Sequence, residues 1–209
     1  MLESDNKAIK FDKMVRDKSN DELGLFEKYD EILADIRSRI IEHKAASVID
    51  IGCGTGNLCG ELSCQMDILG IDLSLEMIIQ AKKKYSSMKL KSGNFLDKPF
   101  KENVADIVVT TYAFHSLNND EKKEAVKNML GYLNNHGKII IADFMFENDI
   151  ERKNCFNNLY EKGRQDLWNV INNKHYTNLE RFEKYIKSLR YEIRIEHIVN
   201  FTWIVEIEK

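Results

Sequence analysis

Apolar residues recur along the first two thirds of the chain in two alternating rhythms. Between residues 30 and 41 they are spaced as on one face of a helix, which predicts a helix that ends before Ala46. The next apolar run, residues 48–51, is short and is cut off by a glycine cluster, a pattern typical of a buried strand. The region therefore begins with a helix followed by a strand.

The same alternation continues as far as residue 142. We predict strands at 67–71, 88–91, 105–110 and 138–142, with helices at 57–64, after Ser74 and after Asn118. Ser74 is a good N-cap, Asn118 and Glu121 have the spacing of a capping box, and Gly137 is expected to end the third of these helices. Strands that alternate with helices predict βαβ units and a parallel sheet.

The last third of the chain has a different pattern. Residues 150–164 predict a helix, and Thr177 with Glu180 has the spacing of a capping box before another helix. Two segments, 193–196 and 201–207, then alternate strictly between apolar and polar residues, with Asn200 at a turn between them. Strict alternation across a short link predicts an antiparallel hairpin.

The chain has no low-complexity linker, internal repeat or break in composition, so we predict a single domain over residues 1–209. We divide it into an N-terminal helical extension or lid (1–45), a ligand-binding core (46–143), a helical cap (144–190) and the terminal hairpin (191–209). The extension and residues 144–176 are expected to cover a pocket, with Trp168, His175 and Tyr176 as candidate lining residues.

Composition narrows the function classes. The chain is 43% hydrophobic and 31% charged, as in soluble globular proteins, and its formal net charge of -3 argues against a dedicated nucleic-acid binder. The polar start does not resemble a signal peptide and no apolar run could span a bilayer, so we expect a cytoplasmic protein without membrane contact. The four cysteines form no C-x-x-C pair, and we expect no metal site. The oligomeric state stays open.

A glycine-rich loop between a predicted strand and a predicted helix carries the candidate chemistry. Gly52, Gly54 and Gly56 let the backbone turn sharply and approach a ligand, beside the unpaired N–H groups of a helix start. The pattern is G-x-G-x-G, because Asn57 occupies the third glycine position of the dinucleotide fingerprint G-x-G-x-x-G. Asp72 ends the next strand, where a carboxylate can bind both ribose hydroxyls. These features predict an adenosyl ligand.

Several segments resemble motifs of class I S-adenosylmethionine (SAM)-dependent methyltransferases. Residues 50–57, 70–74, 93–97 and 106–117 are similar to motifs I, post-I, II and IV. T-Y-A-F-H-S-L at 111–117 and G-K-I-I-I-A-D at 137–143 resemble in particular the small YrrT-type methyltransferases of low-GC Gram-positive bacteria. The resemblance extends from about residue 25 to the end. It implies an α/β fold with a doubly wound, mostly parallel seven-stranded sheet of order 3-2-1-4-5-7-6, which agrees with the C-terminal antiparallel hairpin.

The resemblance also implies which residues hold the methionine end of SAM. Gly52, Gly54 and Gly56 would pass beneath the methionine part, and Asp50 would steer its ammonium group through water. The backbone of Thr110 would line the same end.

Four further residues are implied at the adenosine end. Asp72 would hold the ribose and Leu73 would lie against the adenine, with Asn94 and Phe95 at the adenine edge. Relatives often have aspartate at position 94, but the amide oxygen of Asn94 can still accept a hydrogen bond from the adenine amino group.

The methyl acceptor is expected to be a small molecule. The segment after the fourth strand, T-T-Y-A at 110–113, is not the N-P-P-Y run of many exocyclic-amine methyltransferases, and there is no Pro–Cys pair of the cytosine-C5 type. His115 follows that strand at the edge where the methyl group should point, so it is a candidate general base, with pocket lining or helix capping as the alternative. Two other functions stay open: a SAM-binding module without turnover and a nucleotide-dependent oxidoreductase.

Overall fold

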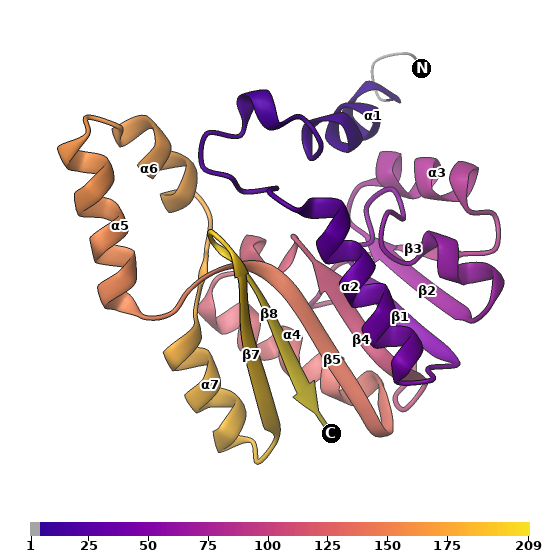
Figure 1. Cartoon of the computed structure of the whole chain (residues 1–209). Helices are drawn as coiled ribbons and strands as arrows, with labels where there is room; N and C mark the ends of the chain where they lie inside the picture. Colours follow the sequence, from indigo (N-terminus) through magenta and orange to yellow (C-terminus); the bar gives the residue numbers. More distant parts are fainter. Residues whose placement is uncertain (1–4) are drawn as a thin grey trace.

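The computed structural model describes residues 5–209, and within them a central sheet lies between two layers of helices (Figure 1). The sheet contains eight strands in the described chain: β1 Ser47–Ile51, β2 Asp67–Asp72, β3 Lys89–Ser92, β4 Ala105–Thr111, β5 Leu133–Phe146, β6 Thr177–Asn178, β7 Glu192–Val199 and β8 Thr202–Glu208. Its order is β3-β2-β1-β4-β5-β8-β7, with β6 paired to β5. β1 to β5 run parallel, and β8 and β7 add antiparallel strands at one edge.

The predicted topology is confirmed, with one addition. β6 is a strand of two residues that pairs with the end of β5, Met145 opposite Thr177, so the hairpin strands become seventh and eighth in chain order. A segment of two residues is too short to show an alternation of apolar and polar residues, so the sequence could not predict β6. It is a strand only because its backbone pairs with that of β5.

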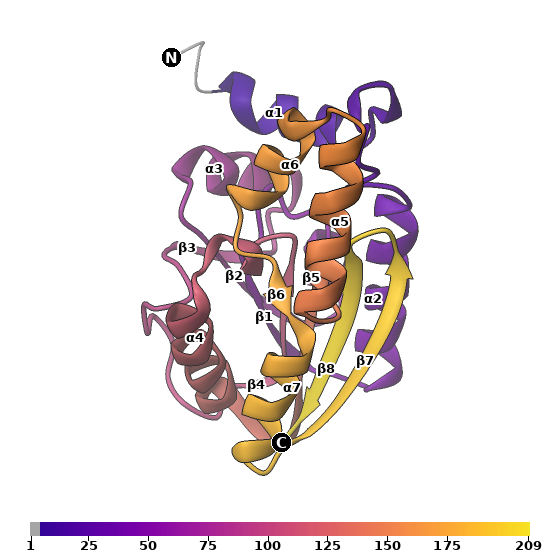
Figure 2. The same cartoon turned by 90° about the vertical axis from the view of Figure 1, so that its left-hand side faces the viewer.

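Helices cover both faces of the sheet (Figure 2). α2 (Tyr29–Glu42) and α3 (Leu75–Lys84) pack on one face, and α4 (Asn119–Tyr132) and α7 (Leu179–Ser188) on the other. Successive residues of β4 are buried on opposite faces, since Val108 belongs to the α4–α7 cluster whereas Ile107 and Val109 belong to the α2 cluster. A strand buried on both sides explains the unbroken apolar run in its sequence.

The remaining helices lie at the carboxyl edge of the parallel strands. α1 (Asp5–Met14) packs against α3, and α5 (Asp149–Glu161) and α6 (Gln165–Asn172) form a pair that projects beside the hairpin (Figure 1). No residue of α5 is fully buried. Three short 3-10 turns complete the described chain: η1 Lys18–Asn20, η2 Gly60–Cys64 and η3 Phe114–Ser116. Nowhere between residues 5 and 209 is there a helix long and apolar enough to cross a membrane.

Two predicted helix caps are confirmed. Ser74 Oγ accepts the Met77 N–H, and Asn118 and Glu121 form a capping box in which each side chain bonds the other's backbone N–H. The cap predicted at Thr177 is wrong, because Thr177 belongs to β6 and the following residue, Asn178, accepts the Arg181 N–H instead.

Two element boundaries also differ from the prediction. Within residues 57–64 only Gly60–Cys64 takes a helical form, the 3-10 turn η2. The Tyr85 ring packs directly against Gly56 and Gly60, and glycine disfavours the helical state. β5 starts at Leu133 rather than 138, since Leu133 pairs with Ala105 before an irregularity in the ladder, and Gly137 therefore lies inside the strand.

Candidate functional site

The glycine-rich loop leaves the end of β1 with three glycines at positive φ: 75° at Gly52, 53° at Gly54 and 82° at Gly56. At Gly52 a Cβ atom would lie 2.5 Å from the Cβ of Ala113, which follows β4. A side chain is therefore excluded both by conformation and by space. The loop keeps bare backbone facing the point where β1 and β4 end.

Asp72, the last residue of β2, joins this loop to the start of α3. Its Oδ2 accepts the Gly54 N–H and its Oδ1 accepts the Ser74 N–H, both at 2.8 Å. A carboxylate oxygen has two lone pairs, so each can still accept a hydroxyl hydrogen bond. The carboxylate is thus fixed in position and keeps the capacity to bind a ribose.

Asp50 lies behind the loop and is 1% exposed. Neither of its carboxylate oxygens has a hydrogen-bond partner of normal geometry among the described residues. Burial raises the pKa of Asp50 to about 7; the neighbouring Cys59 thiol opposes this rise and the charge of Asp72 adds to it. A buried carboxylate without a partner is costly, so Asp50 is chemically suited to a cationic ligand group.

A cavity of about 440 Å³ opens at the carboxyl edge beside these residues. That volume is within the range of small-molecule sites, and the cavity lies where the strand order reverses between β1 and β4, as open α/β sheets place their ligands. It is lined by Ile51, Gly52, Asp72, Leu73, Gly93, Asn94, Phe95, Leu96, Tyr112, Ala113, His115, Ser116, Leu117 and Glu121.

The cavity brings together six of the predicted site residues: Gly52, Asp72, Leu73, Asn94, Phe95 and His115. The other four, Asp50, Gly54, Gly56 and Thr110, are not among its lining residues. Thr110 is fully buried in β4, and its hydroxyl has no partner among the described residues. The predicted site is therefore partly assembled in one cavity and partly behind it.

The Asn94 side chain is hydrogen-bonded within its own loop. Its Oδ1 accepts the N–H groups of Leu96 at 2.7 Å and Asp97 at 3.3 Å, which closes a local turn. Leu73 is 74% exposed at the cavity wall and offers apolar surface to a flat ring.

His115 is paired with Asp143, a residue that the sequence reasoning did not select. His115 Nδ1 lies 2.6 Å from Asp143 Oδ1, and the backbone N–H of His115 donates to Asp143 Oδ2 at 2.8 Å. Asp143 is fully buried in β5, and its Oδ1 also accepts the Phe144 N–H at 2.7 Å. One signal was available in the sequence, since Asp143, like Asp72, interrupts an apolar strand near its carboxyl end.

Aromatic rings and a buried cation surround this pair. The His115 ring lies 5.1 Å from Phe144 and 6.5 Å from Tyr176, measured between ring centroids. Lys122 is also buried. Its ammonium group donates to the backbone oxygen of His175 and interacts with the carboxylate of Asp143. Burial lowers the pKa of Lys122 to about 8, and Asp143 partly opposes that shift.

Of the three residues predicted to line the pocket from the cap, two lie beside His115 and the third lies between α5 and α6. Tyr176 contacts His115, and the backbone N–H of His175 donates to the His115 carbonyl at 2.9 Å. Trp168 instead packs on Phe156 between α6 and α5, with ring centroids 5.2 Å apart.

The N-terminal segment reaches the glycine-rich loop through Asp12, another residue missed from the sequence. Its Oδ1 accepts the Thr55 hydroxyl at 2.7 Å and the Asn57 amide at 2.8 Å, and its Oδ2 pairs with Lys84. Burial opposes ionisation of Asp12, but Lys84 and the two hydrogen bonds outweigh it and lower the pKa. This contact fastens α1 over the loop.

A doubly wound sheet finished by an antiparallel hairpin, with a glycine-rich loop and an acid bonded to that loop at the carboxyl edge, defines the fold of a class I SAM-dependent methyltransferase. A family model described as a methyltransferase domain matches residues 48–137. Magnesium protoporphyrin IX methyltransferase from Synechocystis, solved with bound SAH, has the same fold, with a TM-score of 0.70 at 15% identity over 96% of this chain and 94% of that one.

Closer sequence relatives are bacterial and carry the description "uncharacterized methyltransferase". The chain is 31% identical to one from Alkaliphilus oremlandii, over 96% of this chain and 93% of the relative. It is 32% identical to YrrT of Bacillus subtilis, over 88% and 85% of the two chains. The chain belongs to this YrrT-like family of methyltransferases, and its methyl donor is SAM.

Proposed function

We propose that this protein transfers the methyl group of SAM to a small-molecule acceptor, with His115 as general base. The observation that carries the cofactor part is the pair of carboxylates at one sheet edge: Asp72, fixed by two N–H groups, and Asp50, buried without a partner. The first suits two hydroxyls and the second suits an ammonium group, and SAM carries both.

The residues of the chain hold SAM in distinct ways under this proposal. Gly52, Gly54 and Gly56 admit the methionine part, Asp50 neutralises its ammonium group through water, and the Thr110 backbone borders that end. At the other end Asp72 binds the ribose hydroxyls, while Leu73, Asn94 and Phe95 contact the adenine. At Gly54 no other group of the described chain lies within 4 Å of the position that a Cβ would take, which supports a close approach of the ligand to the loop.

SAM supplies a methyl group on a sulfonium, which an acceptor lone pair displaces while the carbon–sulfur electron pair returns to sulfur. The chain contributes orientation and exclusion of water, and positioning of two reactants supplies about 7–11 kcal/mol of such barriers. The aromatic rings at Phe144, Tyr112 and Tyr176 give the neighbourhood of His115 the apolar character that this role needs.

The His115–Asp143 pair supports a proton acceptor at this place. Asp143 Oδ1 accepts a hydrogen bond from the Nδ1–H of His115, which favours the tautomer in which Nε2 carries a free lone pair. The Asp143 carboxylate is held beside His115 by hydrogen bonds from two backbone N–H groups, those of His115 and Phe144. His115 Nε2 then takes the proton of an acceptor hydroxyl or thiol, and Asp143 stabilises the imidazolium.

Calorimetry tests the cofactor proposal directly. We expect heats of binding for SAM and S-adenosylhomocysteine and none for NAD, because the loop lacks the third glycine of the dinucleotide pattern. Binding of NAD without a SAM signal would contradict it. Release of S-adenosylhomocysteine in the presence of a panel of small hydroxyl and thiol compounds, but not with RNA, DNA or protein, would support a small-molecule acceptor.

A further inference from the structure

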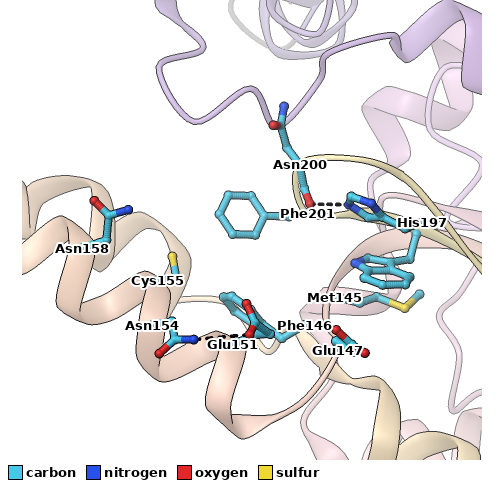
Figure 3. Close-up of a pocket in the computed structure, with 11 residues that line it drawn as sticks. Met145, Phe146, Glu147, Glu151, Asn154, Cys155, Asn158, His197, Asn200 and Phe201 are labelled. Atoms are coloured by element: carbon cyan, nitrogen blue, oxygen red, sulfur yellow. Dashed lines mark hydrogen bonds between the residues drawn. The ribbon is translucent and has the colours of Figure 1, made fainter.

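A cavity of about 520 Å³ lies between α5 and the tip of the β7–β8 hairpin (Figure 3). Some of its polar side chains are already paired: Asn154 donates to Glu151 at 3.3 Å, and the His197 ring bonds the Asn200 carbonyl at 2.9 Å, as the dashed lines in Figure 3 show. None of the buried, partnerless side-chain oxygens of the described chain lines this cavity. The cavity therefore gives no sign of a missing ligand.

A smaller cavity, of about 270 Å³, lies where α4 and α7 begin and does give such a sign. Figure 2 shows these two helices side by side on one face of the sheet, and the Tyr185 hydroxyl of α7 donates to the Lys123 carbonyl of α4 at 3.1 Å. We call this cavity the α4–α7 pocket. It is bounded by Lys122 and Lys123 on α4, Thr177 on β6, and Arg181, Phe182 and Tyr185 on α7.

Lys122 brings a buried cation without a counter-ion to the pocket. The residue is 3% exposed and forms no ion pair within the described chain, because Asp143 acts on it only from a longer distance. Of the three N–H groups of its ammonium, one is used by the His175 carbonyl. Burial lowers the pKa of Lys122 only to about 8, so the ammonium remains the major form at pH 7. A buried charge without a counter-ion is costly, so Lys122 suits an anionic ligand group.

Thr177 brings a second polar group that lacks a partner. It is 3% exposed, and its Oγ1 has no hydrogen-bond partner among the described residues. The carbonyl that holds the Lys122 ammonium belongs to His175, two residues before Thr177, so the ammonium and the hydroxyl lie at the same end of the pocket. A carboxylate can accept a hydrogen bond from each of them, which satisfies both groups.

The surroundings of this end of the pocket also favour an anion. No aspartate or glutamate of the described chain lines the pocket, and α4 and α7 both direct the positive ends of their dipoles toward it. Lys123 and Arg181 line it as well, but they pair with Asp120 and Asp149 in exposed ion pairs. They therefore add little, and the site depends on Lys122.

We propose that the α4–α7 pocket binds a small organic carboxylate. Lys122 and Thr177 donate to the carboxylate, and the rings of Phe182 and Tyr185 contact the apolar body of the ligand. One ammonium and one hydroxyl match a single negative charge better than the two charges of a phosphate, and ring surface offers inorganic phosphate no contact. This binding goes beyond the proposed methyl transfer and does not depend on it.

Three probes with the same ring and different head groups test the proposal. Benzoate carries a carboxylate, benzamide a neutral head of nearly the same shape, and benzylammonium a cation. Saturation-transfer NMR at pH 7 measures the Kd of each probe. We expect saturable binding of benzoate, binding of benzamide that is about tenfold weaker or less, and no saturable binding of benzylammonium or of inorganic phosphate.

Substitutions locate the bound probe. Lys122→Met keeps the length of the side chain without its charge and should raise the Kd for benzoate about tenfold to hundredfold. Thr177→Val keeps the shape and removes the hydroxyl, which should raise this Kd about threefold to tenfold. Lys127→Met, an exposed position of α4 outside the pocket, is the matched control and should change nothing. Because the Thr177 hydroxyl has no partner to lose, Thr177→Val should also keep the wild-type melting temperature and SAM affinity.

Each outcome bears on the site separately from the methyl transfer. Equal affinity for benzoate and benzamide, or equal effects of Lys122→Met and Lys127→Met, overturns the site even if SAM binds normally. Inorganic phosphate that displaces benzoate with similar affinity overturns the assignment of an organic carboxylate. Weaker benzoate binding in both Lys122→Met and Thr177→Val supports the site, and if the same wild-type protein binds no SAM, the proposed function alone is contradicted.

Discussion

Replacing Asp50 by asparagine should change stability and SAM affinity in opposite directions. The pKa of Asp50 is raised to about 7, because the carboxylate is buried and the Cys59 thiol only partly opposes the effect of burial. An aspartate in an unfolded chain titrates near pKa ~3.9. Between roughly pH 4 and pH 7 the native state therefore binds more protons than the unfolded state, so the free energy of unfolding falls as pH rises through this window.

The magnitude follows from the difference between the two pKa values. A difference of about three units corresponds to about 4 kcal/mol, and relaxation around the charge reduces this to about 2–4 kcal/mol above pH 7. The amide introduced by Asp50→Asn cannot ionise, so the variant should escape this loss. At pH 8 its melting temperature should exceed that of the wild type by about 5–15 °C, since 1 kcal/mol shifts a domain of this size by ~2–4 °C.

SAM affinity should move the other way. Loss of the carboxylate that neutralises the ammonium group should weaken binding about tenfold to hundredfold, as for other hydrogen bonds to charged groups. Binding to the wild type near pH 6.5 should also release a proton from Asp50, because a nearby cation favours its charged form. The variant should release none.

Thermal melts from pH 5 to pH 8 and calorimetry in two buffers of different ionisation enthalpy measure both effects. Glu102→Gln, an exposed acid before β4, serves as the control and should melt like the wild type at each pH. The reasoning fails if the wild type and Asp50→Asn lose stability equally between pH 5 and pH 8, or if the variant is the less stable protein at pH 8.

Three further predictions concern the same site. Asp72→Ala should weaken SAM binding about tenfold to hundredfold with the fold retained; unchanged affinity by calorimetry would make Asp72 a loop brace only. His115→Ala and Asp143→Asn should each lower kcat about 10²–10⁴-fold at constant SAM affinity, and ¹⁵N NMR should show Nε2 of His115 unprotonated in the wild type but not in Asp143→Asn; a protonated Nε2 in the wild-type resting state would refute the pairing. Gly52→Ala should destabilise the fold by about 1–3 kcal/mol through its positive φ and its clash with Ala113, with partial recovery in the double variant carrying Ala113→Gly; melts that show no loss would exclude the clash.

The sequence determined the elements whose signals are local. The apolar run at β4, the alternation in β7 and β8, and the caps at Ser74 and Asn118 each depend on neighbouring residues, so they could be predicted from periodicity and side-chain chemistry. The glycine-rich loop and Asp72 belong to the same group, since a strand, a turn and a strand-ending acid follow one another within 23 residues of sequence, 50–72.

Only the tertiary structure decided which distant residues meet. Asp143 is 28 residues from His115 in sequence, and Asp12 is 43 residues from Thr55, so no local pattern links either pair. The two-residue strand β6 and the early start of β5 likewise exist because a neighbouring strand supplies hydrogen bonds. The loss of the helix predicted at 57–64 has the same origin, since the Tyr85 ring, folded back from the end of α3, packs against the glycines there. Long-range packing overrides local preference at these points, and the pairing of the candidate base His115 with Asp143 is a product of it.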